Sequence, residues 1–477
     1  HGVGASITTG TQNTLIGAEA GDALTAALEN VAIGYQAQST DTLGRRTVSV
    51  GNGALQTQNF TTATNSYNVA VGYDAGTSIT TGNKNVLIGG LAGDALTDSD
   101  TNVAIGYVAL SSDTLGQTST AIGNGALRDQ NFTTATNSEN VAVGYQAGLS
   151  CTTGKENTIV GALAGDALTV GEKNVVIGAG ALTADDVGSR CVAVGWDALG
   201  SQNATGATAN NFYNTAVGAN TGFSITEGYY NTLVGGLAGD GITTGLQNTA
   251  VGYLALSASA ASGNTAIGNE ALAVNGGSNN TAIGLNAGKA ATSGNGGFFI
   301  GKDAGLTGSP GGNFTSSQNI GVIGDENISA IHTQVNLTVA SDQRDKTDFT
   351  PLDLGLDFVK ALAPVTYKWD KRSKYGDKTA DDYDLNEQTP DGTHKEDWLD
   401  VGFKAQEVEA LEAAAGYKIA DKTNLTTTLS SDGKQYGMKY EKFVPILVKA
   451  VQELSTENDA LETEIAAIKT RLDALED

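Results

Sequence analysis

The sequence predicts a mainly β protein, in which a parallel β-roll solenoid of 17 rungs is followed by a smaller α+β domain that ends in a coiled coil. Three observations support this fold class. A nine-residue pattern, Asn-x-(Ala/Leu/Val)-(Ile/Val)-Gly-x-x-Ala-(Gly/Leu), recurs through residues 1–305, composition changes near residue 340, and residues 444–477 carry a heptad pattern. A short repeat of constant phase indicates stacked equivalent units rather than a globular enzyme.

The repeat is marked by a glycine that usually recurs every 17 residues. The residue before this glycine is Ile or Val in every copy, and the residue three positions after it is Ala except at Thr221. β-Branched residues at constant phase stack between rungs about 4.8 Å apart, which gives a solenoid about 80 Å long, and the glycine permits a turn with positive φ. The rung glycines are Gly17, Gly34, Gly51, Gly72, Gly89, Gly106, Gly123, Gly144, Gly161, Gly178, Gly195, Gly218, Gly235, Gly252, Gly268, Gly284 and Gly301.

An asparagine opens most rungs, and we expect the stacked side-chain amides to hydrogen-bond along the solenoid axis. Thr47, Ser119 and Cys191 replace this asparagine in every fourth rung, which reveals a higher repeat of 72 residues. After each of these three residues the step to the following rung lengthens to 21 or 23 residues. Solenoid insertions map to one face, so these long loops are the expected place for specificity.

Residues 341–477 differ in composition from the preceding part of the chain. They contain only 7 of the 63 glycines but four of the five prolines. Net charge is negative in both parts, so nucleic acid is a poor partner, and without a run of 18 apolar residues we expect no membrane insertion. Cys151 and Cys191 lie at least two rungs apart, which is too far for a disulfide bond. Two unpaired thiols suit assembly in a reducing cytoplasm.

We expect no cofactor and no metal. His332 and His394 are isolated, and neither zinc spacing nor a Ser-His-Asp set is visible. One acid per Ala-Gly-Asp turn falls short of the six to eight oxygens that Ca²⁺ takes; these acids are Asp22, Asp94, Asp166 and Asp240. Six rung glycines are each followed directly by an aromatic residue. These side chains either stack on sugar rings of a ligand or stack on one another at the surface because the rung spacing aligns them. They are Tyr35, Tyr73, Tyr107, Tyr145, Trp196 and Tyr253.

The rung motif resembles the head repeats of trimeric adhesins of the YadA type over roughly residues 10 to 305. Units of that family read as variants of Asn-x-x-Ile/Val-Gly-x-x-Ala. The resemblance implies left-handed parallel β-rolls that pack side by side as a homotrimer. This chain departs from the family in its 16- or 17-residue rungs with periodic long loops and in lacking the C-terminal anchor of an autotransporter.

Three motifs follow residue 340 in a fixed order. They are Ser341-Asp342-Gln343-Arg344-Asp345-Lys346, Val-Gly-Phe-Lys-Ala-Gln-Glu-Val at 401–408, and Tyr-Glu-Lys-Phe-Val-Pro-Ile-Leu at 440–447; between the first two we expect a helix at 352–362 and a strand at 365–369. Together they resemble the self-cleaving intramolecular chaperone domain at the C-termini of phage endosialidase tailspikes and tail fibres, also found in the myelin gene regulatory factor. The resemblance covers residues 341–477. It implies a domain that trimerises, templates the folding of the fibre ahead of it, and then cuts itself off.

The same resemblance implies the roles of individual residues. Ser341 is the nucleophile, Lys346 its general base, and the cut falls between Ala340 and Ser341, with Asp342 and Arg344 as positioning residues. A lysine amine serves as a base only when neutral, which requires burial or nearby positive charge. Five positions on a continuous helix would splay the two side chains by about 140°, so a turn must bring them together. Without the flanking motifs, the two residues would simply be solvated.

Two positions depart from the chaperone family's pattern. Lys404 stands where an apolar residue is usual, and Asp345 adjoins the expected base, where it would favour protonated Lys346.

Residues 444–477 are predicted to form a trimeric coiled coil. Ile465 and Ile468 place isoleucine at both a and d, which favours three or more strands, and Asn458 at an a position would fix the register. The alternative is an amphipathic helix packed on its own domain. The remaining core positions are Val444, Val451 and Leu472 at a, and Leu447, Leu454, Leu461 and Leu475 at d.

These observations divide the chain into a receptor-binding solenoid shaft (1–305), a connector (306–340) and a chaperone auto-processing domain (341–477). Alternation of Ile331, Val335, Leu337 and Val339 predicts extended connector strands that pair between subunits. We expect a phage tail fibre or spike, assembled in the host cytoplasm and located in the virion. Its partners would be a host cell-surface glycan or protein receptor and other phage tail proteins. A tailspike that depolymerises host polysaccharide and a bacterial trimeric adhesin are the alternatives.

Overall fold

The computed structural model describes residues 2–203, 210–258, 262–316, 318–334, 339–378, 380, 382–430 and 432–476. The chain divides into two compact units. Unit 1 contains residues 1–298 and 318–320, and unit 2 contains residues 299–317 and 321–477.

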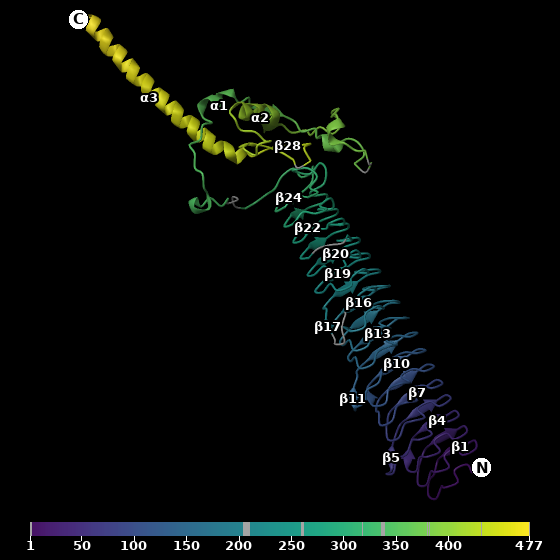
Figure 1. The fold of residues 1–477 in the computed structure, drawn as a ribbon. Helices are drawn as coiled ribbons and strands as arrows, with labels where there is room; N and C mark the ends of the chain where they lie inside the picture. The colour runs from purple at the N-terminus through teal and green to yellow at the C-terminus, as the bar shows by residue number, and fades with distance from the viewer. Residues whose placement is uncertain are drawn as a thin grey trace. The chain divides into compact units, whose positions relative to one another are not determined.

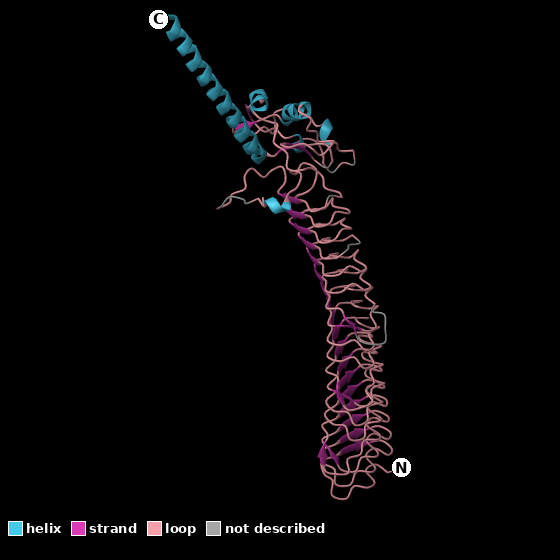
Figure 2. Ribbon diagram, turned by 60° about the vertical axis from the view of Figure 1, so that its left-hand side comes forward, coloured by secondary structure: helices cyan, strands magenta, loops and turns pink. Residues whose placement is uncertain are grey.

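The solenoid is built on one parallel sheet of 18 three-residue strands. The strands from β1 to β22 form a continuous stripe along unit 1 (Figures 1 and 2). Seventeen of these strands end at the residue before a predicted rung glycine, which confirms the parallel solenoid. Strands of successive rungs pair in register, so that Ala32 lies between Leu15 and Ser49. The strands are β1 (Thr14–Ile16), β2 (Val31–Ile33), β4 (Val48–Val50), β6 (Val69–Val71), β7 (Val86–Ile88), β8 (Val103–Ile105), β10 (Thr120–Ile122), β12 (Val141–Val143), β13 (Thr158–Val160), β14 (Val175–Ile177), β16 (Val192–Val194), β18 (Thr215–Val217), β19 (Thr232–Val234), β20 (Thr249–Val251), β21 (Thr265–Ile267), β22 (Thr281–Ile283), β23 (Phe298–Ile300) and β24 (Gly321–Ile323).

Each strand turns its middle residue inward and its flanking residues outward. Leu87 is fully buried, whereas the following Ile88 is 37% exposed; the β-branched ladder therefore lies on the outer face of the sheet. The rung glycine that follows has a positive φ, +134° at Gly89, and a Cβ there would collide with the Gly106 carbonyl oxygen of the next rung. Glycine is thus required both by backbone conformation and by close approach of the rungs.

The asparagine side chains hydrogen-bond along the axis as expected, mostly to backbone groups of the next rung and in places amide to amide, as from Asn85 Nδ2 to Asn68 Oδ1 at 3.4 Å. The Asn13 side-chain oxygen accepts the backbone N–H of Asn30 at 3.0 Å, while Asn30 Nδ2 donates to the Gly44 carbonyl at 2.9 Å. This arrangement satisfies both ends of a buried amide. Thr47, which replaces an asparagine, still donates its backbone N–H to Asn30 Oδ1.

Each long loop adds a short second ladder and a buried carboxylate. The ladders pair β3 (Gly44–Arg45) with β5 (Thr64–Asn65), β9 (Gly116–Gln117) with β11 (Thr136–Asn137), and β15 (Gly188–Ser189) with β17 (Asn210–Asn211). In the second loop Asp113 accepts the backbone N–H groups of Gly116 and Phe132 and a Gln130 amide. Asp41 and Asp185 lie 72 residues to either side of it and are also buried. These aspartates hold the loops against the solenoid.

Unit 2 packs short elements around a small apolar core. Leu354, Phe358, Val408, Phe443 and Ile446 form this core. β25 pairs with β26, and β27 with β28, both antiparallel. The elements are η1 (Gln343–Asp345), α1 (Leu356–Ala361), β25 (Val365–Tyr367), η2 (Arg372–Lys374), η3 (Leu385–Glu387), β26 (Asp400–Gly402), α2 (Ala405–Ala414), β27 (Thr427–Leu429), β28 (Tyr436–Met438), η4 (Tyr440–Lys442) and α3 (Phe443–Glu476).

Two elements of unit 2 are shorter than predicted. The helix expected at 352–362 covers only Leu356–Ala361, because it begins after Gly355 and ends before the residues that precede Pro364. The strand expected to reach Trp369 ends at Tyr367, where its pairing with Asp400 ends.

The C-terminal segment forms the single helix α3, which extends beyond the rest of unit 2 (Figure 1). Its first turns pack on the domain, with Ile446 and Ala450 buried, whereas Leu461 and Ile468 are 56% and 54% exposed. Within the described part of the chain, no helix combines the length and the apolar character needed to cross a bilayer.

Part of the predicted connector adds one more strand to the solenoid sheet. β24 adds a strand at 321–323, joined to β23 by hydrogen bonds from Phe298 N to Ile320 O (2.9 Å) and from Gly324 N to Ile300 O (2.7 Å). Its Val322-Ile323-Gly324 follows the rung pattern, but Ile320 stands where the asparagine belongs and Asn327 where the alanine belongs. Of the alternating residues, Val335 and Leu337 lie outside the described residues.

Candidate active site

The residues before and after the predicted cut lie on a surface segment that contains one tight turn. Asp342 caps the three-residue helix η1, and its carboxylate accepts the Arg344 backbone N–H at 2.9 Å. Backbone hydrogen bonds from Asp345 to Asp342 and from Lys346 to Gln343 complete the turn, both at 3.2 Å. A short polar side chain at the cap explains why the chain reverses here.

This turn brings Ser341 and Lys346 together. Lys346 Nζ lies 2.5 Å from Ser341 Oγ and 3.3 Å from the Ser341 carbonyl oxygen. A serine hydroxyl and an amine within hydrogen-bond reach are the minimum geometry for a nucleophile and its base. The carbonyl of Ala340 is the peptide group directly before this hydroxyl. The catalytic roles stay a prediction, but the required turn is present.

Asp342 and Arg344 form an ion pair beside the dyad. The guanidinium donates from Nε to Oδ1 at 3.1 Å and from Nη2 to Oδ2 at 2.6 Å. Hydrogen bonds from the Arg344 side chain and backbone lower the pKa of Asp342, and the same side-chain contact raises the pKa of Arg344. The pair braces the turn that carries Ser341 and Lys346.

The dyad of this single chain is assembled without being shielded from water. Residues 339–350 are all exposed. Both side chains of the predicted dyad are therefore open to solvent, and the predicted mechanism needs a partner that covers the segment.

Lys404 and Asp345, the two residues that depart from the family pattern, lie in different parts of the domain. Lys404 is exposed at the start of α2, where its ammonium contacts Glu407 at 2.7 Å. Lys346, which follows Asp345, directs its ammonium to Ser341.

Two glutamates organise the frame of unit 2 and were missed by sequence reasoning. Glu412 on α2 is fully buried and accepts Thr426 N at 2.6 Å and Thr426 Oγ1 at 2.9 Å, together with the backbone N–H groups of Leu425 and Thr427. Glu453 on α3 accepts Leu356 N at 2.6 Å, which ties the long helix to the start of α1. The sequence does carry one signal for Glu412: it is an acidic residue at a position of α2 where the helical period places apolar side chains.

The other predicted candidates lie on or inside the solenoid. The aromatic residues after the rung glycines are exposed, from 47% at Tyr35 to 60% at Tyr73. Cys151 and Cys191 are free and buried, and burial raises the pKa of each thiol to about 12. Among the described residues, no three His, Cys, Asp or Glu side chains gather as a metal site.

Comparison with known proteins identifies one region. Residues 341–417 match a family described as chaperone of endosialidase, and the match begins at the predicted nucleophile. Neither curated proteins nor solved structures match the chain. The chaperone family implies autoproteolytic self-cleavage within this domain, and the domain together with the β-solenoid fits a tailspike-like or fibre-like protein that carries its own C-terminal chaperone. The YadA-type resemblance of the repeats stays a prediction.

Proposed function

We propose that this chain forms a homotrimeric phage tail fibre or tailspike whose C-terminal domain assists folding of the solenoid and then cleaves the Ala340–Ser341 bond. One observation carries the proposal: the chaperone match starts at Ser341, whose hydroxyl lies 2.5 Å from the Lys346 amine. A cut at this point severs the matched domain from the solenoid.

The chemistry needs only this serine, this lysine and water. Neutral Lys346 accepts the proton of the Ser341 hydroxyl as Oγ attacks the carbonyl carbon of Ala340. The C–N bond breaks, Lys346 returns the proton to the Ser341 nitrogen, and the acyl group is held as an ester on Oγ. Water then hydrolyses the ester, which leaves a carboxylate on Ala340 and a free amino group on Ser341.

Trimer formation would supply the shielding that the single chain lacks. The heptad positions of α3 include Leu461 and Ile468, which are more than half exposed and gain burial in a three-stranded coil. Neighbouring chains brought together in this way would cover residues 339–350 and favour the neutral lysine. Cleavage would then follow assembly.

The solenoid would serve as the shaft that attaches the virion to a host cell-surface glycan or protein receptor, with other phage tail proteins as further partners. Support comes from the three long loops at one phase and from the exposed aromatic residues, of which Trp196 is 57% exposed. Aromatic faces bind sugar rings through apolar contact. New reducing ends released from host capsule or lipopolysaccharide would instead identify a depolymerising tailspike.

A denaturing gel of the assembled protein tests self-cleavage. Wild type is expected to give two fragments, whereas Ser341→Ala and Lys346→Ala each leave a chain of 48.5 kDa that still assembles. Lys404→Ala is the matched control, because it removes an exposed lysine of the same domain that contacts Glu407 rather than Ser341. An uncut wild-type trimer after prolonged incubation would contradict the proposal, as would normal cutting of Lys346→Ala.

A further inference from the structure

The predicted cut lies between two segments that both belong to unit 2. Residues 299–317 and 321–340 precede the cut, yet they cluster with the domain that follows it. We call residues 305–316 and 321–328 the docking segment. It has a compact local structure, with Ser309 and Phe314 buried and the Phe314 ring 6.4 Å from that of Phe299. A break in a surface loop severs the backbone but leaves the contacts on either side intact.

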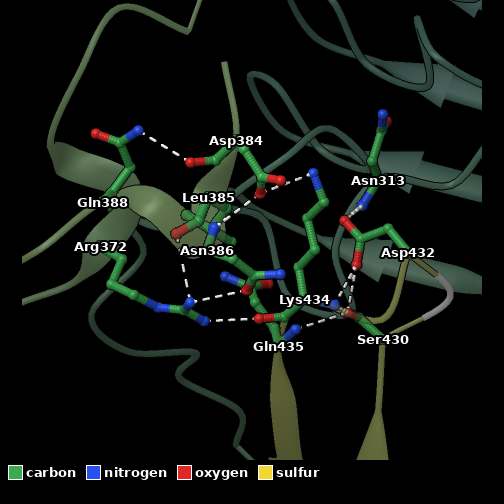
Figure 3. Close-up of polar contacts among 10 residues, drawn as sticks. All are labelled: Asn313, Arg372, Asp384, Leu385, Asn386, Gln388, Ser430, Asp432, Lys434 and Gln435. Atoms are coloured by element: carbon green, nitrogen blue, oxygen red, sulfur yellow. Dashed lines mark hydrogen bonds and ion pairs between the residues drawn. The ribbon is translucent and has the colours of Figure 1, made fainter. Parts of the chain in front are cut away.

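The first attachment of the docking segment is to the turn between β27 and β28 (Figure 3). Asp432 accepts the backbone N–H of Asn313 at 3.1 Å, and the same carboxylate accepts the Ser430 hydroxyl and the Lys434 backbone N–H. Gly312 lies so close that a Cβ would stand 2.7 Å from Asp432 Oδ1 and 2.9 Å from Ser430 Cβ. The backbone of the docking segment therefore contacts the turn between β27 and β28 directly.

The second attachment centres on Glu326. Its side chain is 10% exposed and forms an ion pair with Lys378, while its carbonyl oxygen accepts Lys371 Nζ at 2.6 Å. Nearby, a Cβ on Gly308 would stand 2.7 Å from Ser373 Cβ. Every partner of the docking segment in these two attachments follows Ser341 in the chain. After the cut, all of these partners therefore remain on the chaperone domain.

The surface that receives the docking segment is braced by its own contacts (Figure 3). Arg372 on η2 donates to the Leu385 carbonyl at 3.3 Å and to the Lys434 carbonyl at 2.6 Å. Lys434 in turn pairs with Asp384 at 3.0 Å. Because these links join η2, η3 and the β27–β28 turn, the surface is held in its binding conformation before any cut occurs, which limits the entropic cost of binding.

We propose that the chaperone domain binds the docking segment as a noncovalent ligand, so that cleavage at Ala340–Ser341 nicks the protein without separating its two pieces. This inference rests on the proposed self-cleavage. The contacts are hydrogen bonds and ion pairs, whereas the apolar core of the domain is formed by residues from Leu352 onward. Salt therefore weakens the attachment, and three copies in a trimer strengthen it through avidity.

The test compares a denaturing gel with size-exclusion chromatography and light scattering of the same full-length sample. At about 0.05 M salt, where screening is weak, two bands on the gel should elute as one species. The double variant Glu326→Gln/Asp432→Asn should release the domain at least about tenfold faster, because it removes two hydrogen-bonded charges. Asp357→Asn is the matched control, since it changes a fully exposed aspartate on α1. Immediate separation of the wild-type pieces, or equal retention of the double variant, would overturn the proposal.

A second form of the chain separates this inference from self-cleavage. It carries Ser341→Ala and a site-specific protease sequence inserted after Val339, on the exposed segment, so that the nick is supplied from outside. Co-elution after this cut supports docking even if the native chain never cleaves itself. Separation after this cut overturns docking, even if the native chain does cleave itself.

Discussion

The solenoid and unit 2 are stabilised by opposite kinds of contact. In the solenoid each interaction recurs from rung to rung: the backbone N–H of Asn30 binds Asn13, and that of Asn85 binds Asn68 in the same way. In unit 2 each important contact occurs once and joins residues distant in sequence, as Asn313 joins Asp432. A repeated contact leaves a period in the sequence. A single long-range contact leaves none.

The largest expected effect breaks a repeated contact. Gly89→Val places a side chain at φ +134° against the Gly106 carbonyl, and it should lower the free energy of unfolding by at least about 3 kcal/mol. Gly90→Ala is the control at the next position, where a Cβ would be an ordinary 3.6 Å from the Tyr107 ring. Thermal unfolding measures both variants. Equal stabilities would show that the rungs are less closely stacked than the structure has them.

A smaller effect is expected from breaking a single contact in unit 2. Glu412→Gln keeps the side-chain volume but turns an amide donor toward groups that themselves donate, so it should cost about 1–3 kcal/mol. Hydrogen-exchange mass spectrometry should show faster exchange of the Thr426 and Thr427 amides, which donate to Glu412. Glu409→Gln, one turn earlier on α2, should leave those amides protected. Unchanged protection in Glu412→Gln would refute the anchoring role.

The smallest effect concerns the buried aspartate of a long loop. Burial raises the pKa of Asp113, against opposing hydrogen bonds from Gln130 and backbone groups. In the window between the ordinary pKa of 3.8 and the raised value, the folded state holds more protons than the unfolded state, so stability falls as pH rises. Asp113→Asn should remove this dependence. As pH falls through the window, the free energy of unfolding of the wild type should rise relative to that of the variant, as measured by denaturant unfolding at several pH values. A pH-independent difference between the two proteins would show that the pKa of Asp113 is not raised by folding.

The contrast between the regions also explains what could be predicted from sequence. The Ile/Val-Gly period located the 17 rung strands between β1 and β23, because every rung uses the same residue types at the same phase, but not the two-residue strands of the long loops. β24 was missed since both Ile320 and Asn327 interrupt that pattern, although Val322 and Ile323 follow it. The buried Asp41, Asp113 and Asp185 were missed despite their 72-residue spacing.

In unit 2 the motif predicted the residues but not their surroundings. The spacing of Ser341 and Lys346 required a turn, and η1 provides it. The exposure of this dyad had no sequence signal, because shielding depends on which chains pack around it. The docking of Asn313 on Asp432 likewise depends on the fold of residues 119 positions apart.

Intact-mass spectrometry of the purified protein reports directly whether the bond between Ala340 and Ser341 has been cut. We predict two masses, one of which corresponds to residues 341–477 with a free Ser341 amino group, and a single uncut mass for Ser341→Ala. A single chain mass of 48.5 kDa for the wild type, or a cut at another bond, would contradict self-cleavage at Ala340–Ser341.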